Sequence, residues 1–215
     1  TYEGYTFELG KDIDLNDLDN TWEAIGYHVH ISRPNQVKNQ SPDGSSIVFE
    51  GTFNGNNNRI TLQSEQLYSL FGCLGTKGEI KNLKIYGKMS SNPNRQSFGG
   101  VCAYSYGEIR NCYSEIDQVN RDDIAFKQTV GGIVAGNFGL VESCKAKVHM
   151  KAEADGQVYL GGIVGLSKFG VTENCKLLSG SEITGLSLPS PWGPGMGFSG
   201  GIVGAMASAS GNKGA

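Results

Sequence analysis

The sequence predicts an all-β chain folded as a parallel β-helix, and three observations support this prediction. A four-residue phrase recurs at intervals of 31, 32, 30 and 39 residues. A second phrase recurs at intervals of 29, 32 and 31 residues. The apolar runs in both are four or five residues long and end at Gly, Asn or Ser, which suits short strands and leaves no room for a helix. We therefore expect a right-handed solenoid of similar coils, since parallel crossovers are nearly always right-handed.

The composition excludes several other classes of protein. The chain has 215 residues, of which 38% are hydrophobic and 18% charged, so it can bury a sizeable core. Its 32 glycines follow no three-residue period, which excludes collagen. A net charge of -3, without a block of Lys or Arg, disfavours nucleic acid as a partner. The sequence contains no run of 18 apolar residues, so we expect no membrane insertion. We expect a single monomeric domain over residues 1–215.

Residues 1–66 are expected to form the opening coils of the solenoid. A long loop, residues 27–48, interrupts them. Their strand-like runs are Tyr5–Leu9, Asp12–Leu15, Trp22–Gly26 and Phe49–Asn56. Residues 67–215 hold the repeats, and the last copy lacks its second phrase. Since the chain also lacks an initial Met, we expect a piece cut from a longer protein.

The first phrase contains a Val- or Ile-rich run that usually follows paired glycines. Paired glycines suit a backbone turn with positive φ or a close approach between coils. The residue Ile163 is expected to face the core. The copies are Ser69–Gly72, Gly100–Ala103, Gly132–Ala135, Gly162–Gly165 and Gly201–Gly204.

The second phrase is predicted to form stacked columns of equivalent side chains. Its copies are Glu79–Leu83, Glu108–Cys112, Leu140–Cys144 and Val171–Cys175. One column faces inward: Leu83, Cys112, Cys144 and Cys175. Another lies at the strand ends, where the asparagines would hydrogen-bond up the stack: Asn82, Asn111, Ser143 and Asn174. The acidic and basic residues Glu79, Lys81, Glu108 and Arg110 predict a salt-bridged ladder on the surface.

The five cysteines are interpreted as buried thiols. They form an odd set without a Cys-x-x-Cys pair, which disfavours a disulfide framework and a zinc knuckle. Besides the three of the inward column, they are Cys73 and Cys102. Buried cysteine behaves as a small hydrophobic residue.

Taken in order, these phrases resemble the GLUG-repeat family of bacterial surface and secreted proteins. That family includes the repeat regions of immunoglobulin A1 protease-like metallopeptidases and many adhesin-like proteins. The resemblance implies an elongated module located outside the cell or on the bacterial surface. In such peptidases the chemistry belongs to a separate zinc domain bearing His-Glu-x-x-His, and that string does not occur in these 215 residues. The 22 residues between Gly26 and Phe49 are longer than the link that the family pattern leads us to expect.

Two groups of residues have the composition of a metal site, but each has a simpler explanation. His28 and His30 would face the same way on an extended segment, but a solvated loop explains them as well. His149 is interpreted as an exposed strand residue. Four acidic residues suit calcium, although they also suit charged shielding of the first coil: Asp12, Asp14, Asp17 and Asp19. We therefore assign no catalytic, cofactor-binding or metal-binding residue.

Insertions between the repeats are the expected contact surfaces. They are Tyr27–Val48, Asp117–Thr129 and Leu186–Phe198, the last of which carries Trp192, Met196 and Phe198. These three side chains suit contact with a partner or packing on the solenoid. The expected partner is a host or bacterial surface protein or a glycan. We expect the chain itself to bind no cofactor.

Three functions remain open from the sequence. The leading hypothesis is a non-catalytic interaction or spacer module of an adhesin-like protein. An alternative is the accessory repeat region of an immunoglobulin A1 protease-like zinc metallopeptidase. The third is a polysaccharide-active enzyme, because parallel β-helices also host lyases and hydrolases.

Overall fold

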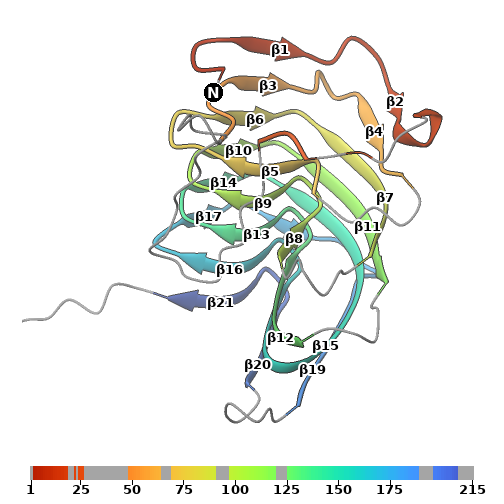
Figure 1. The fold of residues 1–215 in the computed structure, drawn as a ribbon, viewed down its shortest axis with the longest axis vertical. Coiled ribbons are helices and arrows are strands. Elements are labelled where there is room, and N and C mark those ends of the chain that lie inside the picture. The colour runs from red at the N-terminus through yellow and green to blue at the C-terminus, as the bar shows by residue number, and fades with distance from the viewer. Residues whose placement is uncertain are drawn as a thin grey trace, which may run out of the picture.

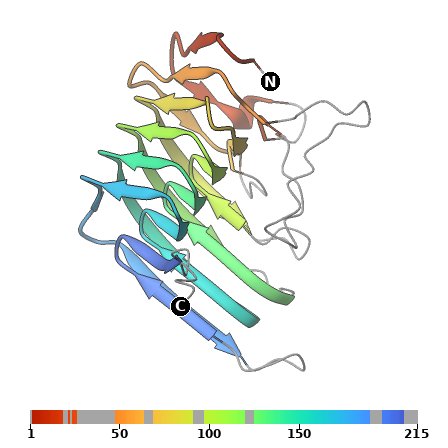
Figure 2. The same ribbon diagram turned by 90° about the vertical axis from the view of Figure 1, so that its left-hand side faces the viewer.

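The computed structural model describes residues 2–18, 22, 24–26, 48–63, 69–90, 97–119, 125–188 and 196–207. Over these residues the chain is all-β apart from one 3-10 turn, η1 (Leu15–Asp17). The strands form three sheets, called A, B and C, in which every strand pairing is parallel. Figures 1 and 2 show equivalent strands stacked one above another, from β1 at one end to β21 near the other. This arrangement is compatible with a parallel β-helix.

Sheet A holds the second phrase of each repeat. Its strands lie in chain order, so each pairs with its equivalent in the next coil. Glu108, for example, lies opposite Glu79 on one side and Leu140 on the other, which is the alignment that the repeats predicted. The strands are β1 (Thr6–Glu8), β3 (Thr52–Asn54), β6 (Glu79–Lys81), β10 (Glu108–Arg110), β14 (Leu140–Glu142) and β17 (Val171–Glu173).

Sheet C holds the first phrase. Phe71, Cys102, Val134, Val164 and Val203 lie in register across it, again as the repeats predicted. An isolated bridge joins Ile25 to Phe71, so the opening segment reaches the same column. The strands are β5 (Phe71–Leu74), β9 (Cys102–Ser105), β13 (Val134–Asn137), β16 (Val164–Lys168) and β21 (Val203–Ala207).

Sheet B is the largest, and it connects the other two around each coil. Its longest strand, β15 (Lys145–Gly161), pairs with two strands of the preceding coil and three of the following coil. The long, curved β15 is visible in Figure 1. The other strands are β2 (Ile13–Asp14), β4 (Arg59–Thr61), β7 (Lys84–Ser90), β8 (Ser97–Gly99), β11 (Tyr113–Val119), β12 (Ala125–Gly131), β18 (Lys176–Leu177), β19 (Glu182–Leu188) and β20 (Met196–Gly200).

Sheet B corrects the expectation that the insertions Asp117–Thr129 and Leu186–Phe198 are loops. Strands β11 and β12 occupy both ends of the first insertion, and β19 and β20 occupy both ends of the second. Residues 120–124 and 189–195 between them lie outside the described residues. The reason is that β15 offers a continuous line of backbone groups with which each half can pair.

The corners between sheets A and B explain the column at the strand ends. Asn82, Asn111, Ser143 and Asn174 have φ values of 53°, 51°, 56° and 54°. Asn is the non-glycine residue that adopts this left-handed conformation most readily. Asn82 donates a side-chain hydrogen bond to Asn54 of the previous coil, at 3.1 Å. Among the described residues no side-chain bond joins the column members to one another. The backbone N–H groups of Asn82 and Asn111 do donate to the next coil, to Arg110 and Glu142, so the expected hydrogen bonds up the stack are present and run through the backbone.

The paired glycines lie at the corners between sheets B and C, where coils approach closely. A Cβ atom on Gly161 would overlap the carbonyl oxygen of Val164, and one on Gly132 would overlap that of Gly162. Neither residue has a positive φ. Close approach, not a left-handed turn, is therefore the reason that these positions hold glycine.

The core consists of columns of side chains that face inward from the three sheets. Leu83, Cys112 and Cys144 are at most 2% exposed, while Cys175, in the last described copy, is half-buried. Each thiol of this column also contacts a carbonyl oxygen of the preceding coil at 3.6 to 3.8 Å. All five cysteines are free, as predicted, and Ile163 is fully buried.

Candidate functional site

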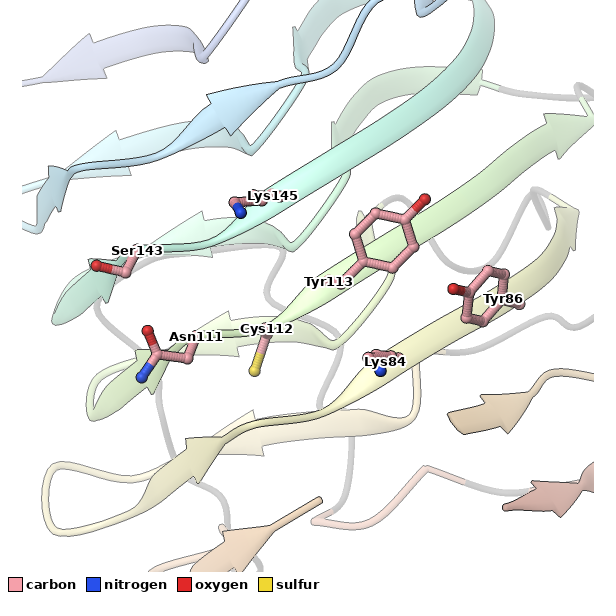
Figure 3. Close-up of a pocket in the computed structure, with 7 residues that line it drawn as sticks. All are labelled: Lys84, Tyr86, Asn111, Cys112, Tyr113, Ser143 and Lys145. Carbon is pink, nitrogen blue, oxygen red and sulfur yellow. The ribbon is translucent and has the colours of Figure 1, made fainter. Parts of the chain in front are cut away.

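A hollow of about 420 Å³ lies on the outer face of sheet B. It forms where β7, β11 and β15 lie side by side, close to the corner with sheet A (Figure 3). Its lining includes two lysines and two tyrosines, and it has no carboxylate and no histidine among the described residues. The lining residues are Lys84, Tyr86, Asn111, Cys112, Tyr113, Ser143 and Lys145.

Strand alternation determines which side chains reach this hollow. Ile85, Ser114 and Ala146 are fully buried, so the residues before them on the same strands face outward. Those residues, Lys84, Tyr113 and Lys145, lie directly opposite one another across the three strands.

The same row continues into the neighbouring strands on either side. Arg59 of β4 lies opposite Lys84, and Lys176 of β18 lies opposite Lys145. The row therefore consists of four cations and one tyrosine over five coils. We call it the cationic column: Arg59, Lys84, Tyr113, Lys145 and Lys176.

Two tyrosine rings form the aromatic part of the site. The ring centroids of Tyr86 and Tyr113 are 5.4 Å apart, and the rings are tilted by 48°. The guanidinium of Arg59 lies 5.8 Å from the centroid of the Tyr86 ring, within range of a cation–π interaction. Figure 3 shows the two rings on adjacent strands, with Lys84 and Lys145 nearby.

A hydrogen-bonded group fixes the Tyr113 side chain. Its hydroxyl donates to Glu115 at 2.8 Å, and Lys147 donates to the other carboxylate oxygen of Glu115 at 2.9 Å. Partial burial, together with the bond to Glu115, raises the pKa of Tyr113 to about 12, so its hydroxyl keeps its proton at neutral pH. The bonds from Lys147 and Tyr113 lower the pKa of Glu115, which favours its charged form.

The charges of the cationic column are only partly balanced. Arg59 approaches Asp12, with 3.7 Å between the nearest nitrogen and oxygen, and Asp12 also accepts the Arg59 backbone N–H. Within the described parts of the chain, no carboxylate lies within 4.0 Å of the ammonium group of Lys84, Lys145 or Lys176. These three lysines can therefore receive an anionic ligand without first breaking an ion pair.

The outer face of sheet A differs, because its charges are paired as the sequence predicted. Lys81 lies 2.6 Å from Glu79 of the same strand. Arg110 lies 3.0 Å from Glu108 and also pairs with Glu142 of the next coil. The pairs link carboxylates to cations both along and across strands, which confirms the predicted surface ladder.

The described geometry gives little support to the two candidate metal sites. His28, His30 and Asp19 lie outside the described residues. Asp14 caps η1 by accepting from the backbone N–H and the side chain of Asn16. Among the described residues, no three His, Cys, Asp or Glu side chains gather as metal ligands would. His149 is exposed, as predicted, and its Nδ1 lies 2.8 Å from Asp117.

The predicted contact surfaces are only partly described. Tyr27–Val48 lies outside the described residues except for Val48, and Trp192 lies outside them as well. Met196 and Phe198 are each 43% exposed, and Phe198 stacks on Tyr159 with ring centroids 5.4 Å apart. Phe198 thus packs partly on the sheet. The described parts of the chain contain no helix with the length and apolar character of a membrane span.

The sequence interpretation missed the cationic column, although the repeat alignment contains it. Each of its last four members directly follows a residue of the inward column: Lys84, Tyr113, Lys145 and Lys176. The inward positions belong to the repeated phrases, whereas each outward residue lies one position beyond them. Arg59 precedes the first complete repeat, and only strand pairing places it in the row.

Comparisons with known proteins give no family for the chain. No family model matches it, and no curated protein and no solved structure matches it either. The functional interpretation therefore depends on the geometry of the chain itself.

Proposed function

We propose that the chain is a non-catalytic binding module of a bacterial cell-surface or secreted protein, built as a right-handed parallel β-helix of GLUG-type repeats. Support for the β-helix comes from the strand pairings, which join equivalent residues of successive repeats in all three sheets. The family and the location are supported by the resemblance of the repeat phrases alone.

The hollow on sheet B is the observation that carries the binding role. It combines cations, aromatic rings, an amide and hydroxyl groups on the broad face of a sheet. Surfaces of this composition suit recognition, since they offer hydrogen bonds, charge and flat apolar area together.

The arrangement of carboxylates favours binding over catalysis. Glycoside hydrolysis usually requires two carboxyl groups flanking one bond. The hollow contains none, and on sheet A Glu79, Glu108 and Glu142 are engaged with Lys81 or Arg110. Among the described residues, therefore, neither the hollow nor sheet A offers a free pair of carboxylates to the polysaccharide-active enzyme considered from the sequence.

Prolonged incubation with a panel of polysaccharides and surface proteins tests this proposal. We expect the chain to be retained by a ligand in affinity electrophoresis while reducing ends, unsaturated uronides and peptide fragments stay at the level of the blank. Release of product that grows with protein concentration would contradict the proposal. Inactivity of the same preparation after heating would show that any product came from the folded chain.

A further inference from the structure

The spacing of the cationic column suits a linear polyanion. Neighbouring parallel strands lie about 4.8 Å apart, so equivalent side chains two strands apart, such as Lys84 and Lys145, start about 10 Å from each other. Arg59 and Lys84 are immediate neighbours, as are Lys145 and Lys176. Like charges placed directly opposite destabilise a sheet, and an anion lying along the column removes that repulsion.

The column is one side chain wide, which limits the shape of the ligand. The next outward row contains Tyr86 and the paired Glu115 and Lys147. Beyond it lie Asp117 and Glu182, opposite His149. A broad polyanion such as a DNA duplex would meet these carboxylates, whereas a single chain running along the stack would avoid them.

The neutral groups of the hollow indicate a ligand rich in hydroxyl groups. The Asn111 amide and the Ser143 hydroxyl can both donate and accept hydrogen bonds at one rim. The Tyr113 ring, fixed by its bond to Glu115, offers an apolar face between the two lysines.

From these features we infer that the cationic column binds an acidic polysaccharide, which runs along the stack across the strands. Its carboxylate or sulfate groups contact Lys84 and Lys145, and a sugar ring lies on Tyr113. Arg59 and Lys176 extend the contact at the two ends. This inference rests on the proposed binding role and adds to it the site and the chemical class of the ligand.

The test measures binding of the intact chain to two acidic polysaccharides, each with a neutral counterpart. The probes are polygalacturonate with its methyl ester, and dextran sulfate with dextran. We expect each acidic member to bind and its neutral counterpart to bind at least about tenfold more weakly, with the affinity falling as salt is added. Binding of the uronate alone or of the sulfate alone supports the inference and identifies the acidic group.

Two double variants locate the site. Lys84→Ala with Lys145→Ala should weaken binding by about tenfold or more. The control, Lys88→Ala with Lys151→Ala, changes the net charge equally on the same face but outside the column, and should change the affinity by about twofold or less. Unchanged melting temperatures show that both variants remain folded.

Several outcomes would overturn the inference. Equal binding of acidic and neutral counterparts would leave a binding module that recognises something other than charge, so the proposed function would survive while the inference failed. An equal loss in the control variant would show general charge attraction in place of the column. Tighter binding of single-stranded oligo(dT) than of both acidic polysaccharides would assign the column to nucleic acid. Depolymerisation of a probe would instead contradict the proposed function itself.

Discussion

The outer faces of sheets A and B share one stacking geometry but differ in how their charges are paired. In both, equivalent residues of successive repeats become neighbours across parallel strands. On sheet A acidic and basic residues lie within reach of each other along and across the strands, and Arg110 bridges Glu108 and Glu142. On sheet B the cationic column places Lys145 beside Lys176 without a carboxylate partner among the described residues. Opposite charges within reach of each other stabilise the face of sheet A, whereas the lysines of sheet B stay available for the ligand that we propose.

The largest effect should come from breaking the core that supports both faces. Ile163→Asp places a carboxyl group at a fully buried position and should lower the free energy of unfolding by about 3 kcal/mol or more. Chemical denaturation measures it. The matched control is Val171→Asp on an exposed strand position, 53% accessible, which should cost far less. Equal losses would show that Ile163 does not face the core.

Removing the centre of the sheet A ladder should have a moderate effect. Arg110→Ala leaves Glu108 and Glu142 without their shared cation and should lower stability by about 1 kcal/mol at most, because the pairs are partly exposed. Thermal melts at low and high salt measure the loss, which added salt should reduce. The exposed Lys88→Ala serves as control. An effect of Arg110→Ala that does not change with salt would contradict an ionic ladder.

Replacing one lysine of the cationic column by glutamate should create an ion pair like those on sheet A. Lys145→Glu would place a carboxylate opposite Lys176 and should raise stability by a few tenths of a kcal/mol, roughly the value of a cross-strand ion pair. The same change should abolish binding of acidic polysaccharide. Lys151→Glu lies opposite Thr184 and should give neither result. A Lys145→Glu variant that is less stable and still binds acidic polysaccharide would contradict both the predicted ion pair with Lys176 and the binding role of the column.

The smallest effect is a pH dependence beside the column. Lys147 and Tyr113 lower the pKa of Glu115 in the folded chain. The charged Glu115 side chain therefore stabilises the fold above the ordinary glutamate pKa, and this stabilisation is lost as the pH falls through the lowered pKa. The difference in melting temperature between the parent and Glu115→Gln should therefore be present at about pH 7 and shrink as the pH falls below the ordinary glutamate pKa of about 4.3. A difference that grows in acid would reverse the assigned sign.

Most of the fold could be predicted because the repeats encode the strand register. The alignment of Glu79 with Glu108, and of Cys102 with Val134, is the pairing that the structure contains. The extent of sheet B could not be predicted, because β15 runs through Lys145–Gly161 without an apolar phrase of its own in its middle. Its strand character depends on pairing with neighbours on both sides, which is a tertiary effect.

The candidate site could be predicted only in its parts. Lys84 and Lys145 recur as the same residue type, but Tyr113 interrupts the series, and each of these residues lies one position beyond the end of the repeated phrase. Their common feature is position, one residue after the inward column, and it has meaning only when the coils are stacked. The ion ladder was easier to predict, since Glu79 and Glu108 recur as the same residue type at equivalent positions.

Disulfide trapping tests the central claim, that stacking in register creates the column, most directly. Lys84→Cys with Tyr113→Cys places two thiols at positions that lie opposite each other on adjacent strands. Their Cα atoms should then be about 5 Å apart, within the range that a disulfide spans. The control pair, Lys84→Cys with Glu115→Cys, is offset by two residues on the same face, which takes it beyond that range. Mild oxidation, followed by peptide mapping, should link the first pair and leave the second as free thiols. Linking of the offset pair at an equal or greater rate would contradict the register and, with it, the cationic column.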